Sequence, residues 1–268
     1  MSAERGPRVH GHLARKRFGQ HFLVDHRVLD GILLAVSPRD DQRLVEIGPG
    51  LGALTDVLLE RIGRLTAIEI DRDLAQRLRE RYPAQRLNLI EGDALRTDWR
   101  ALAGGDQLRL VGNLPYNVAT PLMTGLIPVR ERILDAHFMI QREVAERLCA
   151  REGGAAYGRL GVLMQAFFEM EIVLEVPPEA FDPPPRVDSA VVRLCPLEDP
   201  GVADMNMLEQ LLSAAFGQRR KMLRGTLLPW LAARGLNDTD LDPQARPQDI
   251  EPERYHALAN RLSDPDPA

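Results

Sequence analysis

Short apolar segments alternate with amphipathic segments through residues 25–151, and this alternation restricts the chain to a small set of folds. The apolar segments have the length of strands, and the amphipathic segments repeat their apolar residues at helical spacing. A strand, a helix and a second strand in succession form a right-handed βαβ unit, and repeated units build a mostly parallel sheet. The predicted strands cover 43–48, 65–70, 87–90, 108–113 and 136–140, and the predicted helices cover 25–36, 54–62, 72–81, 143–151 and 159–168.

The pattern changes toward the C-terminus. Two β-rich segments, 170–176 and 189–195, are joined by a proline-rich loop with no helix between them, so we expect an antiparallel pair at the sheet edge. After the composition shift at 196–201, apolar residues recur at helical spacing and no strand pattern returns. The sequence therefore predicts an α/β protein in three parts: a basic N-terminal arm (1–24), an α/β domain (25–198) and a helical C-terminal domain with an acidic tail (199–268).

The bulk composition is that of an ordinary soluble protein. A chain of 268 residues suffices for one large α/β domain and a smaller one. No apolar run approaches the roughly 18 residues of a membrane helix, and the polar, basic N-terminus lacks a signal-peptide core, so we expect a cytoplasmic protein. Cys149 and Cys195 do not make a disulfide framework. His10 and His12 have no cysteine or carboxylate cluster beside them, so no metal site is expected.

Positive charge is concentrated in two segments, although the net charge of the chain is −5. Residues 1–20 and 216–225 each carry an excess of basic side chains, whereas 235–268 is acidic. A polyanion responds to the local field of a patch more than to the total charge. Charge alone therefore leaves two interpretations open, a nucleic-acid contact and a solvated surface.

The segment VEIGPGLGALT places Gly48, Gly50 and Gly52 between a predicted strand and a predicted helix. Glycines allow a sharp turn and a close approach to a ligand. Glu69 ends the next strand, where an acid can hold ribose hydroxyls, and Asp93 follows the third, where it can accept from an adenine amino group. The spacing is not G-x-G-x-x-G and the loop has no P-loop lysine. A nucleoside without a pyrophosphate, such as S-adenosylmethionine, therefore fits best.

The string Asn113-Leu114-Pro115-Tyr116 follows directly on the predicted strand 108–113. By itself, such a string often marks only a transition from strand to turn. An amide oxygen can accept a hydrogen bond from an amino group, a proline can fix the turn, and an aromatic ring can stack on a flat base. With the glycine loop upstream, the string predicts a site for an amino group on a planar ring.

Motifs spread over nearly the whole chain carry a resemblance to a known family. In chain order they are HLARKRFGQHFL (12–23), VEIGPGLGALT (45–55), IEIDRD (68–73), GDAL (92–95), GNLPYNVATPL (112–122), HFMIQREVAERL (137–148), YGRLGV (157–162), AFDPPPRVDSAVVRL (180–194) and QRRKMLR (218–224). The chain resembles the ribosomal RNA adenine dimethyltransferases. RKRFGQ, YGRLGV and PPPRVDSAVVRL favour the bacterial members that act on small-subunit rRNA.

The resemblance implies a Rossmann-like class I methyltransferase with a mostly parallel seven-stranded sheet and a small all-α C-terminal domain. The 25–198 domain would then bind S-adenosylmethionine. The expected cofactor contacts lie in the glycine loop, at strand ends and at the end of the arm: His21, Leu23, Gly48, Gly50, Glu69, Asp93 and Asn113. Many relatives have asparagine where this chain has His21, and histidine can still donate a ring N–H or contact the ligand through its backbone.

The resemblance also implies how an adenine amino group would be methylated. The N6 lone pair is delocalised, so no general base is expected; the Asn113 side-chain oxygen and the Leu114 carbonyl would hold both N–H bonds and aim the lone pair at the methyl. Pro115 would fix the turn, and Tyr116 would stack on a base that has left its stack. Phe181 would supply the opposite aromatic face, with an ordinary core aromatic as the alternative.

The implied reaction transfers methyl groups to N6 of two adjacent adenosines near the 3′ end of 16S rRNA, in the immature 30S subunit. A monomer would hold the RNA mainly through charge, with a steep dependence on salt. The candidate RNA contacts are basic residues of the arm, of the helix after the fifth strand and of the C-terminal domain: Arg15, Lys16, Arg17, Arg142, Arg147, Arg219, Arg220, Lys221 and Arg224.

Two alternatives remain open. One is a small-subunit assembly or RNA-binding factor that has lost catalysis, which the intact Glu69, Asp93, Asn113 and Tyr116 disfavour. The other is a large-subunit rRNA adenine methyltransferase, which the flanking motifs disfavour. DNA amino-methyltransferases more often carry a second proline where this chain has Leu114.

Overall fold

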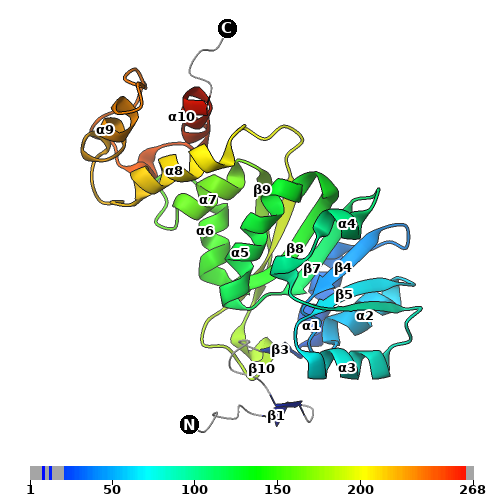
Figure 1. The fold of residues 1–268 in the computed structure, drawn as a ribbon. Coiled ribbons are helices and arrows are strands. Elements are labelled where there is room, and N and C mark those ends of the chain that lie inside the picture. Colours follow the sequence, from blue (N-terminus) through cyan, green and yellow to red (C-terminus); the bar gives the residue numbers. More distant parts are fainter. Residues whose placement is uncertain (1–7, 10–11, 14–20, 264–268) are drawn as a thin grey trace, which may run out of the picture. The chain divides into compact units, whose positions relative to one another are not determined.

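A sheet of seven strands organises the first of the two units into which the chain divides (Figure 1). The structure, a computed structural model, describes residues 8–9, 12–13 and 21–263. The strands are β4 (Arg43–Ile47), β5 (Leu65–Glu69), β6 (Leu87–Glu91), β7 (Leu108–Asn113), β8 (Ile133–Gln141), β9 (Phe168–Val176) and β11 (Ser189–Pro196). Their order across the sheet is β6-β5-β4-β7-β8-β11-β9.

The sheet is mostly parallel, which confirms the prediction from the alternating pattern. β4 runs parallel to β5 and β7, β5 to β6, and β7 to β8. β11 runs antiparallel to β8, and β9 lies beside β11, so the two late strands are neighbours at the sheet edge, as expected. The strand order reverses between β4 and β7. In open α/β sheets this reversal creates a crevice at the carboxyl ends of the strands, where ligands bind.

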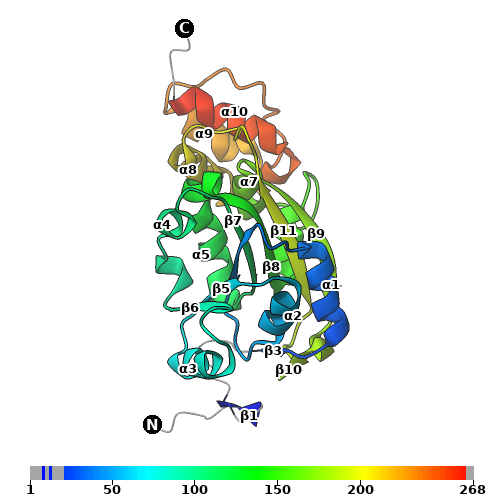
Figure 2. The ribbon, with the colours of Figure 1, turned by 90° about the vertical axis from the view of Figure 1, so that its right-hand side faces the viewer.

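Three helices contribute to the buried cluster on one face of the sheet: α1 (His26–Val36), α2 (Ala53–Arg61) and α3 (Arg72–Arg81). Asp25 and Asp71 cap the first and third by accepting the backbone N–H two residues later. Leu29 of α1, Leu58 of α2 and Leu78 of α3 pack in a buried cluster that also contains residues of the strands. On the other face lie α4 (Trp99–Ala103) and α5 (Tyr116–Leu126) (Figure 2).

A buried ion pair fastens the C-terminal end of α1 to the sheet. The guanidinium of Arg109 on β7 donates to both carboxylate oxygens of Asp135 on β8, at 2.8 and 2.6 Å. It also donates to the Val36 carbonyl at 2.7 Å and to Gln42 Oε1 at 2.8 Å. A buried pair is tolerated when such additional bonds satisfy its charge. This network holds α1 over the face of the sheet on which the functional side chains lie.

The second unit is helical and includes a segment that the sequence pattern places in the 25–198 domain. It comprises Glu146–Met170 and Pro196–Ala268. Its helices are the end of α6 (Arg142–Cys149), α7 (Arg159–Gln165), α8 (Met205–Phe216), α9 (Leu227–Ala232) and α10 (Pro252–Ser263). α7 packs on α8 and α10, and the Tyr157 hydroxyl donates to the Ile250 carbonyl at 2.8 Å. Residues 146–170 therefore pack with the C-terminal helices rather than with the 25–198 domain, in which the sequence analysis included them.

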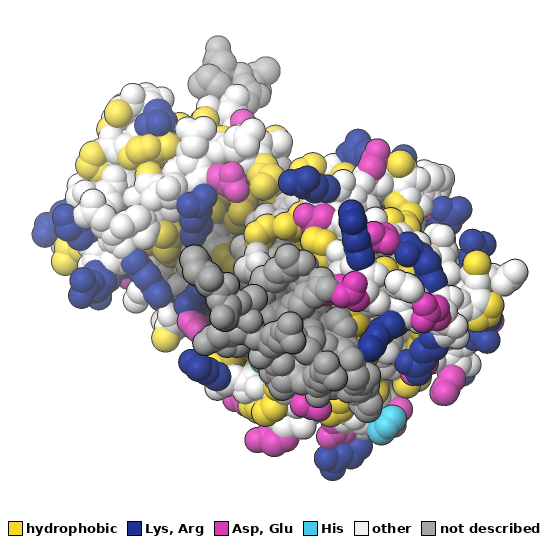
Figure 3. All heavy atoms as spheres, turned by 60° about the horizontal axis from the view of Figure 1, so that its bottom comes forward, with side chains coloured by type: hydrophobic (Ala, Val, Ile, Leu, Met, Phe, Trp, Pro, Cys, Tyr) yellow, Lys and Arg dark blue, Asp and Glu magenta, His cyan; other side chains and the backbone are white. Residues whose placement is uncertain are grey.

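The remaining strands among the described residues form two short sheets. β1 (Arg8–Val9) pairs with β2 (His12–Leu13), and β3 (Phe22–Leu23) pairs with β10 (Phe181–Asp182). No helix among the described residues is long and apolar enough to cross a membrane. Within the same part of the chain, no group of three or more His, Cys, Asp or Glu side chains is placed to hold a metal ion. On the face shown in Figure 3, basic and acidic side chains are interspersed.

Candidate active site

A large cavity opens at the carboxyl ends of β4, β5 and β7, within the first unit. Its volume of about 1090 Å³ lies just above the range of roughly 300–1,000 Å³ that is usual for small-molecule sites. The ends of these strands, the loop after β4, residues 21–24 and the region of Phe181 line it. The cavity therefore occupies the crevice that the strand order predicts.

The loop after β4 has a conformation that depends on its glycines. Gly48, Gly50 and Gly52 have φ of 68°, 61° and 88°, in the left-handed region. At Gly52, an added Cβ would lie 2.7 Å from the hydroxyl of Tyr82, which itself donates to Asp56 at 2.6 Å. α2 begins directly after Gly52. The turn that the sequence predicts is thus a preformed loop at the edge of the cavity.

Glu69 ends β5 with its carboxylate against the glycine loop. The residue is 4% exposed, and its two oxygens accept from the Gly50 N–H at 3.1 Å and from the Asp71 N–H at 2.9 Å. Burial raises the pKa of Glu69, and these backbone N–H groups oppose the rise. Each carboxylate oxygen has a second lone pair, so Glu69 can also accept from hydroxyls of a ligand in the cavity.

Asp93 follows β6 and also lines the cavity. One of its oxygens accepts from the Leu95 N–H at 3.0 Å and caps the short turn that follows. The other lies 3.9 Å from Nε of Arg96. Because 34% of the side chain is exposed, Asp93 retains capacity to accept a hydrogen bond from a ligand amino group.

Asn113 ends β7 with an amide that the protein itself orients. Its Nδ2 donates to the backbone carbonyl of His21 at 3.0 Å. A carbonyl can only accept, so the amide nitrogen must face His21 and Oδ1 must point away from it. The Leu114 N–H donates to the Met139 carbonyl at 3.0 Å, and Pro115 stands at the N-cap of α5. The turn after β7 is therefore held on both sides, and residues 113–115 line the cavity.

Part of the predicted site lies outside the described residues. The backbone of Tyr116 begins α5, but its side chain is not among those described. Arg15, Lys16 and Arg17 of the arm also lie outside the described residues. The stacking of Tyr116 and the contacts of the arm therefore stay predictions.

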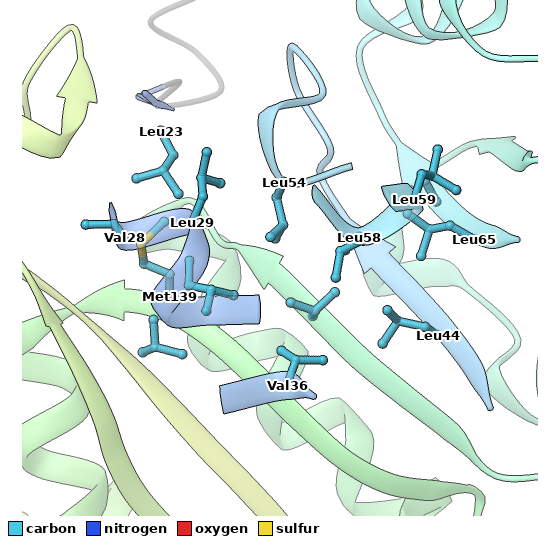
Figure 4. Packing of buried hydrophobic residues seen from close by; sticks show 14 of the residues in the cluster. Leu23, Val28, Leu29, Val36, Leu44, Leu54, Leu58, Leu59, Leu65 and Met139 are labelled. Atoms are coloured by element: carbon cyan, nitrogen blue, oxygen red, sulfur yellow. The ribbon is translucent and has the colours of Figure 1, made fainter. Parts of the chain in front are cut away.

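Phe181 reaches the cavity through pairing with the end of the arm. In the short sheet of β3 and β10, Leu23 pairs with Phe181 and Phe22 pairs with Asp182. Leu23 and Phe181 are buried in the cluster that α1 and α2 form on the sheet, where Leu23 lies near Val28 and Leu29 (Figure 4). Both residues also line the cavity. Phe181 therefore belongs both to the core and to the cavity wall, and its stacking on a base stays a prediction.

Two buried polar residues with no role predicted from the sequence lie on the same face as Glu69 and Asn113. Glu46 on β4 and His137 on β8 both pair with Val111 of β7, which lies between them, two positions before Asn113. Both are 1% exposed and line the cavity. The sequence does contain a signal for both residues, which is a polar side chain in an otherwise apolar strand: Glu46 in VEIG and His137 in HFMI.

Burial changes the protonation of both side chains. It raises the pKa of Glu46 to about 8, although the Thr55 hydroxyl donates to the carboxyl at 2.6 Å. It lowers the pKa of His137 to about 4, and neither ring nitrogen has a hydrogen-bond partner among the described residues. At pH 7 both side chains are therefore largely neutral, and this part of the cavity wall is polar with little charge.

The basic residues expected to contact RNA in the second unit differ in their surroundings. Arg147, Arg220, Lys221 and Arg224 are exposed. Arg219 is half-buried and donates to the Ala155 carbonyl at 2.7 Å. The exposed side chains are therefore the better candidates for a phosphate contact.

Arg142, in the first unit, has acidic neighbours. It is half-buried, and its guanidinium lies 3.7 Å from a Glu175 oxygen and 3.8 Å from an Asp188 oxygen. These carboxylates reduce the positive potential around the guanidinium. Arg142 therefore has less charge to offer a phosphate than the sequence alone indicates.

The comparison with family models agrees with this geometry. The model described as "Ribosomal RNA adenine dimethylase" matches residues 11–264, which is nearly the whole chain. The chain belongs to this family. The resemblance inferred from the motifs is thereby confirmed, and so is the Rossmann-like methyltransferase fold.

Two curated relatives are similar over nearly their full length. The "Ribosomal RNA small subunit methyltransferase A" of Methylibium petroleiphilum is 51% identical over 254 residues, covering 94% of this chain and 98% of that protein. The protein of the same name from Dechloromonas aromatica is 48% identical over 255 residues, covering 94% and 99%.

Two solved structures share the fold. A dimethyladenosine transferase from Plasmodium falciparum has a TM-score of 0.74 at 26% identity, covering 89% of this chain and 96% of that one. The 23S rRNA methyltransferase ErmE has a TM-score of 0.70 at 26% identity, covering 91% and 100%.

Proposed function

We propose that this protein transfers methyl groups from S-adenosylmethionine to N6 of two adjacent adenosines near the 3′ end of small-subunit rRNA, giving N6,N6-dimethyladenosines. The observation that carries the proposal is the convergence of Glu69 and the Asn113–Pro115 turn on one cavity. The first is suited to a nucleoside ribose and the second to an amino group. Membership of the rRNA adenine dimethylase family and relatives named for the small subunit support the choice of substrate.

The residues around the glycine loop fit S-adenosylmethionine. The Phe22 ring lies against the loop, 3.3 Å from where a Cβ on Gly50 would be, and both Phe22 and Gly50 line the cavity. Glu69 would accept from the ribose hydroxyls, and Asp93 from the adenine amino group. When bound, the cofactor supplies an electrophilic methyl group on its sulfonium.

Asn113 and Leu114 would hold the acceptor amine. The Asn113 amide is already turned by the His21 carbonyl, so its Oδ1 is the end available to an N–H of the base. The Leu114 carbonyl would take the second N–H. Both acceptors are neutral, so they favour a pyramidal nitrogen with its lone pair aimed at the methyl, and the rate gain comes from positioning.

The flipped base would lie between two aromatic side chains. Phe181 at the cavity wall would face one side of the ring, and Tyr116, by resemblance, the other. Stacking on an aromatic side chain is worth about 1–3 kcal/mol per base. The cavity, of about 1090 Å³, would have to hold the cofactor and the base and also let the monomethylated amine turn and present its remaining N–H.

The assay that tests the proposal incubates the protein with labelled S-adenosylmethionine and with small subunits that lack the dimethyladenosines. We expect label on N6 of two adjacent adenosines near the 3′ end of the small-subunit rRNA. Large subunits serve as the control substrate and are expected to stay unlabelled. Label in the large subunit, or binding of small subunits without any label, would overturn the assignment.

We further propose that a monomer binds the immature 30S subunit in the cytoplasm, with phosphate contacts from exposed basic residues. Changing Arg220, Lys221 and Arg224 together to alanine is expected to weaken subunit binding. The slope of log affinity against log salt should become shallower by about 1 for each phosphate contact that the substitutions remove. The measurement is a series of binding titrations at increasing salt.

A matched control changes Arg39, Arg61 and Arg64, which are exposed near the amino ends of β4 and β5, away from the cavity. The same charge is removed, so a general effect of net charge would appear in both triple variants. An equal loss in the control, or an unchanged slope in the test variant, would assign the RNA contact to other residues.

A further inference from the structure

His21 lies where the acceptor site and the loop carrying Phe181 meet. Its ring Nδ1 lies 2.8 Å from the backbone carbonyl of Pro183, 162 positions away in the sequence. The carbonyl can only accept, so Nδ1 carries a proton and donates. At the same time, the backbone carbonyl of His21 accepts from the side chain of Asn113 at 3.0 Å. His21 therefore contacts both the side-chain amide of Asn113 and the loop that carries Phe181.

The backbone around His21 continues this attachment. The N–H of Val24 donates to the Ala180 carbonyl at 2.8 Å, and between these ends β3 pairs with β10. The hydrogen bond from the His21 ring to the Pro183 carbonyl joins the two segments one position beyond the last β3–β10 pair, Phe22 with Asp182. The loop 180–183 is therefore tied to residues 21–24 along its whole length.

We propose that His21 is a positioning residue whose side chain serves the protein rather than the cofactor. Its ring N–H holds the loop 180–183, which carries Phe181, and its carbonyl turns the Asn113 amide so that Oδ1 is presented to the base. This inference rests on the proposed function, which supplies the base and its amino group. It differs from a direct contact between the side chain at position 21 and S-adenosylmethionine.

The side chains that could stand at position 21 differ in what they offer the Pro183 carbonyl. Nδ1 of histidine and Nδ2 of asparagine are both bonded to Cγ, so each places an N–H donor at the same distance from the backbone. Leucine has a methyl group at that point, and aspartate has an oxygen that would face the Pro183 carbonyl. The proposal therefore requires a donor at this position and does not require an imidazole.

Three variants separate the roles of His21: His21→Asn keeps the donor, His21→Leu removes it, and His21→Asp replaces it with an acceptor. For His21→Leu we expect kcat/KM for undermethylated small subunits to fall by about tenfold, which corresponds to the loss of one hydrogen bond. The dissociation constant for S-adenosylmethionine, measured by calorimetry without RNA, should stay within about threefold of the wild type, since the cofactor contacts are intact. His21→Asn should retain both values, and His21→Asp should lose at least as much activity as His21→Leu.

A second measurement reads the same variants without any activity. Hydrogen exchange of the backbone amides at 22–24 and 181–182 should be faster in His21→Leu and His21→Asp and unchanged in His21→Asn. Thermal unfolding confirms that each variant is folded. If the wild type labels no small subunit, the proposed function fails, and the exchange rates still decide whether the His21 donor holds the loop.

Three results would overturn the inference. Cofactor affinity that weakens in parallel with kcat/KM would make the side chain a cofactor ligand. A His21→Asn variant as impaired as His21→Leu would show that a donor at Cγ is not the essential feature. Unchanged exchange at 181–182 in His21→Leu would show that the loop is held without this bond.

Discussion

Changing Asn113 to alanine is expected to lower methyl transfer to undermethylated small subunits by about 10²–10³-fold, the range seen when one preorganised polar contact to a transition state is removed. The variant loses the Oδ1 acceptor and keeps the basic residues proposed to hold the RNA. Subunit binding should therefore stay within about twofold of the wild type. Single-turnover methylation and a direct binding titration measure the two quantities separately.

Asn88→Ala is the matched control for this experiment. Asn88 is exposed on β6, at the edge of the sheet remote from β8 and β11, and the same amide is removed. We expect it to methylate at the wild-type rate. Full activity in Asn113→Ala would exclude the proposed role of the amide, and a parallel loss of binding would make Asn113 an RNA-binding residue.

Changing Glu46 to glutamine is expected to remove a large part of the pH dependence of the free energy of unfolding. Burial raises the pKa of Glu46 to about 8 from its ordinary value of 4.5, so the folded protein keeps this proton over a range in which the unfolded chain has lost it. The stability contributed by the neutral form is present below pH 4.5 and is lost as the pH rises toward 8. The total loss is on the order of a few kcal/mol.

Urea unfolding at pH 5, 6, 7 and 8 measures this effect as a difference between wild type and variant. Glutamine keeps the shape and cannot ionise, so the stability of Glu46→Gln relative to the wild type should increase steadily with pH. The trend carries the prediction, because the new amide hydrogens shift the variant by a constant amount. The exposed Glu80→Gln is the control and should follow the wild type at every pH. A constant difference for Glu46→Gln would mean that Glu46 ionises normally.

The fold could be predicted from the sequence because its signals are local. α3 covers 72–81, as predicted, since Asp71 caps its start and Pro83 follows its end. β7 covers 108–113, as predicted, because an apolar run that is buried on both faces reads as a strand. The carboxyl ends of parallel strands lie at one edge of a sheet, so the positions of Glu69 and Asn113 in the chain already predict that both face one cavity there.

Other features of the site could not be predicted, because they depend on which segments pack together. Glu46 and His137 lie far apart in the sequence, on β4 and β8. Only the pairing of both strands with β7 places the two side chains in one buried row. The basic residues illustrate the same limit. In the sequence, Arg142 and Arg219 are simply basic residues, but in the structure the first lies within 4 Å of two carboxylates and the second donates to a backbone carbonyl.

The sequence by itself determined the elements, the order in which they occur and the family, since hydrophobic period, caps, turn residues and motifs are written in neighbouring positions. Only the tertiary structure determined which segments pack around Asn113 and orient its amide. Residues 21–24 meet residues 180–183, and the same short segment turns the amide of Asn113. Such contacts join positions far apart in the chain through hydrogen bonds that any of several residues could make. They leave no local pattern in the sequence. The role of the His21 ring N–H follows only from the position of the Pro183 carbonyl in the folded protein.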